Sequence, residues 1–69
     1  MKKEYYVNKN AQSNGDHEVH VEGCIYMPNA DNRLYLGEFS SCQEAVREAK
    51  KKYAQSNGCY TCSNACHTS

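Results

Sequence analysis

The 69-residue sequence lacks tryptophan, has one phenylalanine and one proline, and has a formal net charge of zero. Val, Ile, Leu and Phe together supply only eight residues, well below the roughly 20% found in chains with an ordinary core. A neutral chain has no overall field to attract nucleic acid or an anionic membrane. No apolar run approaches the ~20 residues of a membrane-spanning helix. The composition therefore predicts a small domain with no membrane partner and no electrostatic preference for nucleic acid.

The N-terminus does not favour secretion. Met1-Lys2-Lys3 has the charge of a signal-peptide start, but polar residues follow where an apolar stretch is required. We therefore expect a cytoplasmic protein. A domain of this size buries only about 60% of its unfolded surface and often needs a metal or a disulfide to stay folded. The five cysteines are the first candidates for that stabilisation.

Three segments predict β-strands, at residues 4–8, 17–26 and 33–39. The first is rich in β-favouring side chains, and the third follows a turn at 27–32 that contains a proline and two asparagines. In the second, apolar residues alternate with polar ones, as in a half-buried strand.

The two histidines of the second predicted strand are assigned surface roles. By alternation His20 lies on the polar face, where we expect it to pair with a carboxylate across the sheet. His17 is expected at the edge of the strand. A role in or beside a metal site stays open for both residues.

A helix is predicted over residues 42–56. Ser41 and Glu44 have the spacing of a capping box, and Gly58 suits the left-handed position that ends a helix. Helical spacing places the following residues on one apolar stripe: Cys42, Ala45, Val46, Ala49 and Tyr53. The predicted fold class is α+β: residues 1–58 form a three-stranded antiparallel β-meander packed by one C-terminal helix, and a cysteine-rich tail, 59–69, is tied to it.

The tail concentrates possible metal ligands. A C-x2-C pair lets one turn direct two thiolates at a tetrahedral ion, which suits zinc. The predicted helix returns along the third strand, so its end lies near the 27–32 turn and Cys24, with Cys42 at the far end. The predicted zinc ligands are Cys24, Cys59, Cys62 and Cys66, with His67 as the substitute if Cys24 points away. Cys42 is then the remaining thiol.

Other states of these cysteines stay open. In an oxidising compartment the same four cysteines would form two disulfides; alternatively, the tail is reduced, metal-free and frayed. A thiol-active or copper(I)-handling protein is a further alternative, because Cys42 lies in the first helical turn, where the dipole favours a thiolate. The C-x2-C pair, in contrast, follows a helix C-terminus, where the helix dipole disfavours a thiolate.

No pattern indicates an enzyme. His17-Glu18-Val19-His20 is one residue shorter than the H-E-x-x-H motif, and that motif requires a helix. Arg47, Lys50 and Lys51 form a basic ridge on the predicted helix, yet lysines near a helix C-terminus also complement its dipole. We therefore expect a non-enzymatic domain with an unidentified protein partner, and keep a protein- or RNA-interaction module as an alternative.

Four short segments of the sequence resemble those of a group of short, uncharacterised bacterial proteins: 14–20 (N-G-D-H-E-V-H), 36–42 (L-G-E-F-S-S-C), 58–62 (G-C-Y-T-C) and 66–68 (C-H-T). The step G-E-F-S-S into an alanine-containing helix is also similar to the YegP-like small domains. That resemblance implies antiparallel strands with a packed helix. It implies no activity and does not extend to the cysteine tail.

Overall fold

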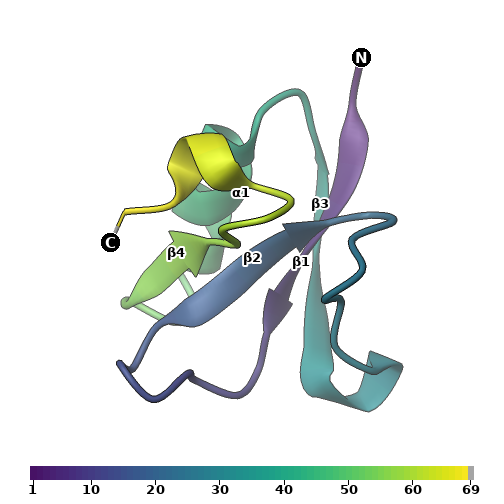
Figure 1. Cartoon of the computed structure of the whole chain (residues 1–69). Helices are drawn as coiled ribbons and strands as arrows, with labels where there is room; N and C mark the ends of the chain where they lie inside the picture. Colours follow the sequence, from purple (N-terminus) through teal and green to yellow (C-terminus); the bar gives the residue numbers. More distant parts are fainter. Residues whose placement is uncertain (69) are drawn as a thin grey trace.

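The computed structural model describes residues 1–68 and shows a mixed sheet with a helix packed against it (Figure 1). The elements are β1 (Lys3–Asn8), β2 (His17–Val21), the 3-10 helix η1 (Ala30–Asn32), β3 (Arg33–Phe39), α1 (Cys42–Ala49), β4 (Ser56–Gly58) and the 3-10 helix η2 (Asn64–Cys66). No helix within the described residues has the length and apolar character needed to cross a membrane.

The sheet has the strand order β3-β1-β2-β4. β1 pairs antiparallel with both β2 and β3, whereas β2 and β4 run parallel. The α+β class is therefore confirmed, but the three-stranded antiparallel meander is only roughly right. The connection between β2 and β3 is not a tight hairpin: it takes the chain to the far side of β1, where β3 pairs. A fourth strand, β4, adds to the free edge of β2.

Two predicted elements are too long. The strand predicted to reach residue 26 ends at Val21, where a turn follows that includes Gly23 at a φ of +84°. The helix predicted to reach residue 56 ends at Ala49, because the chain beyond it pairs with β2 instead. The backbone amide of His17 donates to the carbonyl of Gln55 at 2.9 Å, so tertiary pairing overrides the helical pattern.

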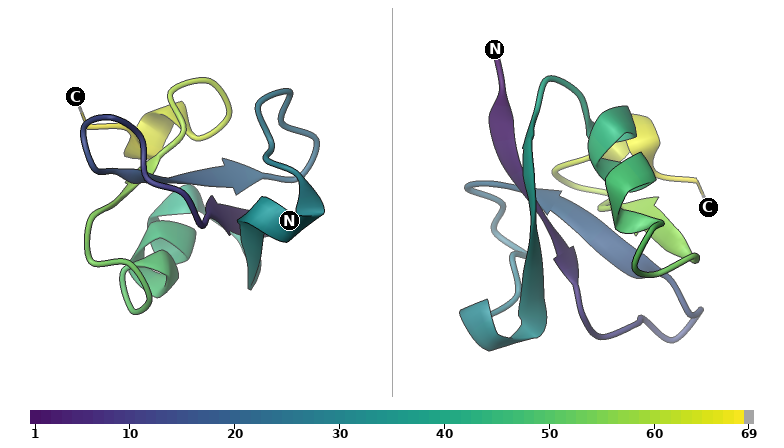
Figure 2. Two further views of the ribbon diagram at one scale, coloured as in Figure 1. Left: turned by 90° about the horizontal axis from the view of Figure 1, so that it is seen from below. Right: turned by 180° about the vertical axis from the view of Figure 1, so that it is seen from behind.

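The core lies between the sheet and α1. Its buried residues are Tyr5, Val7, Val19, Cys42, Ala45 and Ala49. The expected helix start is confirmed, because the Ser41 hydroxyl accepts a hydrogen bond from the Glu44 amide. The view from below shows α1 on one side of β2 and the loop that directly follows β4 on the other (Figure 2). With so few large apolar residues in this core, additional ties must hold the two layers.

A polar clasp holds β4 against the start of β2. The Asp16 carboxylate accepts hydrogen bonds from the side-chain amides of Gln55, at 2.9 Å, and Asn57, at 3.2 Å. These two bonds hold the pKa of Asp16 below its ordinary value. The clasp ties the beginning of β4 to the beginning of β2, just before the cysteine-containing segment that starts at Cys59.

Gly58 is required at the end of β4 because no space exists for a side chain. It is not the left-handed helix cap predicted above but a strand residue. A Cβ atom there would lie 2.6 Å from the Ser63 carbonyl oxygen and 2.7 Å from the Cys66 Cβ. The backbone of β4 and that of η2 thus approach more closely than any residue but glycine permits.

We expect Gly58→Ala to lower the free energy of unfolding by about 2 to 3 kcal/mol, because the clash involves backbone atoms that cannot rotate away. Gly23→Ala is the comparison variant, since nothing lies within 4 Å of its added Cβ and its cost of about 1 kcal/mol comes from the positive φ alone. Urea unfolding of both variants measures the difference. Equal costs would contradict the close approach at Gly58.

Candidate metal site

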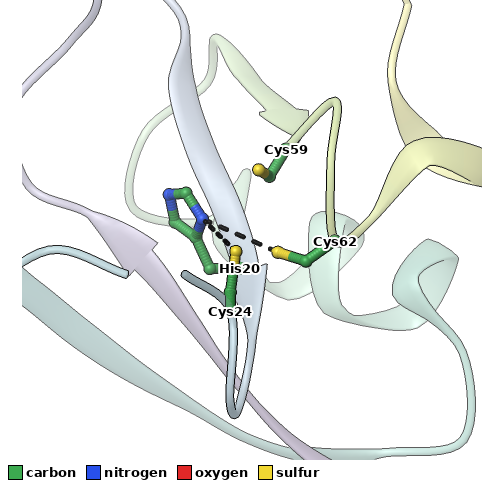
Figure 3. Close-up of side chains that lie close together, drawn as sticks. All are labelled: His20, Cys24, Cys59 and Cys62. Atoms are coloured by element: carbon green, nitrogen blue, oxygen red, sulfur yellow. Dashed lines mark hydrogen bonds between the residues drawn. The ribbon is translucent and has the colours of Figure 1, made fainter. Parts of the chain in front are cut away.

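Four side chains with metal-binding atoms converge at one end of β2: His20, Cys24, Cys59 and Cys62 (Figure 3). Their ligand atoms all lie within 4.8 Å of one another. His20 belongs to β2, Cys24 to the turn after it, and the other two cysteines to the segment after β4. Two parts of the chain that are far apart in sequence therefore meet at this point.

His20 points away from the helix and is nevertheless buried. Adjacent residues on a strand face opposite sides, yet both Val19 and His20 are at most 1% exposed. Val19 packs in the core beneath α1, while the segment that follows β4 crosses the other side (Figure 2). β2 is therefore covered on both faces at the cluster.

The cysteines are positioned by backbone hydrogen bonds. The Cys24 amide donates to the Val21 carbonyl at 3.1 Å and closes the turn after β2. The Cys59 amide donates to the Val19 carbonyl at 2.9 Å, which extends the pairing of β2 with β4. The Ser63 amide then donates to the Cys59 carbonyl at 2.9 Å, and Cys62 lies within this second turn. All three thiols are thus placed by backbone hydrogen bonds that lead back to β2.

Two distances within the cluster match those expected around a tetrahedral ion. The Nδ1 atom of His20 lies 3.6 Å from the Cys24 Sγ and 3.7 Å from the Cys62 Sγ. With Zn–S bonds of about 2.3 Å and Zn–N bonds of 2.0 to 2.1 Å, a tetrahedral ion separates sulfur and nitrogen ligands by about 3.6 Å. The cluster could therefore hold a metal ion.

Burial shifts the pKa of two of the four side chains in the cluster. Burial lowers the pKa of His20, so its ring is neutral near pH 7 and offers a lone pair. Burial, followed by a hydrogen bond with the Cys24 thiol, raises the pKa of Cys62 to about 12. A bound cation reverses this effect, because it stabilises the thiolate directly and displaces the proton.

The structure places three of the five predicted ligands in the cluster, namely Cys24, Cys59 and Cys62. The other two are elsewhere. Cys66 is bonded to Cys42 in a disulfide, so its predicted role as a ligand and the predicted free thiol at Cys42 are both corrected. His67 directs Nδ1 to the Gly58 carbonyl oxygen at 3.0 Å instead.

The disulfide forms because the tail turns back toward the beginning of α1, not toward its end as predicted. The Cα atoms of Cys42 and Cys66 lie 6.1 Å apart, and η2 contacts the helix. Disulfides are typical of oxidising compartments, so the expected cytoplasmic location stays a prediction.

Sequence reasoning gave His20 the wrong environment. It predicted an exposed histidine paired with a carboxylate across the sheet. The residue opposite His20 on β1 is Tyr6, and the nearby carboxylate is that of Glu18 on the same strand as His20. Alternation alone cannot show that a distant segment covers the polar face. The available signal was His20 four residues before Cys24, a second ligand pair to match the C-x2-C pair.

Comparison with protein-family models, with curated proteins and with solved structures gives no match to this chain. The resemblance to YegP-like domains therefore stays a prediction. The function must be inferred from the site itself.

Proposed function

We propose that this protein is a small non-enzymatic domain in which His20, Cys24, Cys59 and Cys62 hold one structural zinc ion. The observation that carries the proposal is the convergence of these four ligand atoms within 4.8 Å. Three thiols and one imidazole form a soft donor set that favours zinc over magnesium or calcium.

The donor count supports a structural role over a catalytic one. Catalytic zinc sites usually have three protein ligands and leave the fourth position to water or substrate. Here four protein side chains fill the tetrahedron. The ion would join the turn after β2 to the segment after β4, across a sheet whose core contains few large side chains.

The test is native mass spectrometry of the full chain purified without added metal or oxidant. We expect one zinc ion per chain, lost on denaturation, and a denatured mass lower by one pair of hydrogens for the Cys42–Cys66 disulfide. His20→Ala and Cys24→Ser should abolish stoichiometric zinc binding. His67→Ala is the matched control and should retain one ion, because His67 lies outside the cluster.

Cobalt(II) serves as a spectroscopic probe of the same site. Cobalt bound by three thiolates and one imidazole gives intense tetrahedral d–d bands together with thiolate-to-metal charge transfer.

A denatured mass lower by a second pair of hydrogens, with no metal bound, would refute the proposal, because two of the three cluster cysteines would then form a disulfide.

A further inference from the structure

We propose that Glu18 is a positioning residue for the zinc site, accepting a hydrogen bond from the Nε2–H group of His20 and thereby directing Nδ1 at the ion. This inference rests on the proposed function. It concerns a residue outside the four ligands, and the geometry around the far side of the imidazole carries it.

The first observation is an unpartnered nitrogen. His20 is 1% exposed, and its Nε2 atom has no hydrogen-bond partner within the described part of the chain. A buried polar atom without a partner costs free energy unless something satisfies it. The other ring nitrogen, Nδ1, is already committed to Cys24 and Cys62.

The second observation is the nearby carboxylate. Glu18 Oε1 lies 3.8 Å from His20 Nε2, slightly beyond hydrogen-bond distance. Glu18 and His20 are two residues apart on β2 and so face the same side of the strand. The Glu18 side chain is only 16% exposed, and the proposed hydrogen bond requires its carboxyl group to move closer to Nε2.

The tautomer connects the two observations. A neutral imidazole has one N–H and one lone pair. If Nδ1 binds the ion with its lone pair, the proton must reside on Nε2, where it faces Glu18. A carboxylate that accepts this proton in a hydrogen bond fixes the tautomer, orients the ring and increases the basicity of Nδ1.

The experiment measures zinc affinity in the full-length chain by competition with a chromophoric chelator. We expect Glu18→Ala to bind zinc about 10- to 100-fold more weakly than the wild type. Glu18→Gln should lose less, because its amide oxygen still accepts a hydrogen bond. Glu48→Ala is the matched control: it removes one carboxylate from the exposed surface of α1, where Glu48 pairs with Lys51, and should leave zinc affinity unchanged.

Nitrogen-15 NMR of the His20 ring separates positioning from a merely structural effect. In the zinc-bound wild type we expect Nδ1 to be the metal-bound nitrogen and the Nε2 proton to exchange slowly with water. In zinc-bound Glu18→Gln, which preserves the size of the side chain, that proton should exchange faster while the backbone spectrum is retained.

Two results would overturn the assignment of Glu18. One is a ring in which Nε2 binds the metal and Nδ1 has the proton. The other is a Glu18→Ala affinity within twofold of both the wild type and Glu48→Ala. A wild-type chain that binds no zinc is a different result, which refutes the proposed function and this inference together.

Discussion

Removing zinc is expected to lower the temperature of thermal unfolding by about 15 to 30 °C. A ligand present at a thousand times its dissociation constant contributes about 4 kcal/mol to stability, and each kcal/mol shifts the unfolding temperature of a domain of this size by about 4 to 8 °C. A domain with so small a core is expected to have only about 3 to 5 kcal/mol from packing. The ion would therefore supply a large share of the total.

Calorimetry of the zinc-loaded chain, before and after addition of a strong chelator, measures this shift. Adding zinc back should restore the original unfolding temperature, whereas adding magnesium should not, because thiolates bind it poorly. Cys62→Ser is the internal control, since its unfolding temperature should no longer depend on the chelator. An unfolding temperature that stays the same when zinc is stripped from the wild type would refute a structural role.

Hydrogen exchange shows which part of the chain loses structure when zinc is removed. The amides of Cys59 and Ser63 donate to backbone carbonyls in the segment that the ion would hold. We expect these amides to lose protection on zinc removal, because the segment opens locally before the sheet unfolds. Amides shared by β1 and β3 lie outside the segment and should change less.

The parts of the fold predictable from sequence are those set by local patterns. The start of α1 follows from the hydroxyl of Ser41 and the spacing to Glu44, which are both local. The end of α1 does not, because residues 56–58 pair with the free edge of β2. Gly58 shows why local patterns are not sufficient. The sequence indicates a turn-forming glycine, but glycine is required there because the backbone around η2 packs against it.

In the candidate site, too, the residues that could be predicted are those with a local signal in the sequence. The C-x2-C pair, Cys59 and Cys62, was recognisable from spacing, and Cys24 followed from the expected course of the chain. His20 was not among the predicted ligands, although a metal role stayed open for it, because its burial depends on a distant segment that folds over β2. The contact of its ring with Cys62, 42 residues away in sequence, shows this. The Cys42–Cys66 pairing was missed because the predicted helix was too long.

Loss of the Cys42–Cys66 disulfide is expected to lower the free energy of unfolding by about 3 kcal/mol and to leave zinc stoichiometry at one per chain. The bond spans 24 residues, and closing a loop of that length removes conformational entropy mainly from the unfolded chain. Cys42→Ala combined with Cys66→Ala removes the bond without leaving a free thiol. Denaturant unfolding and native mass spectrometry of this double variant give the two quantities.

The zinc-free form of the same double variant provides the sharper result. The ion and the disulfide hold different ends of one segment: the ion would hold Cys59 and Cys62, and the disulfide holds Cys66. Losing either tie leaves the other in place, so the backbone amide of residue 66, which in the wild type donates to the Ser63 carbonyl at 2.9 Å, should stay partly protected from exchange. Losing both should release the segment and abolish that protection. If the double variant failed to bind zinc at all, the two ties would not be independent, and the disulfide would instead be a requirement for assembling the site.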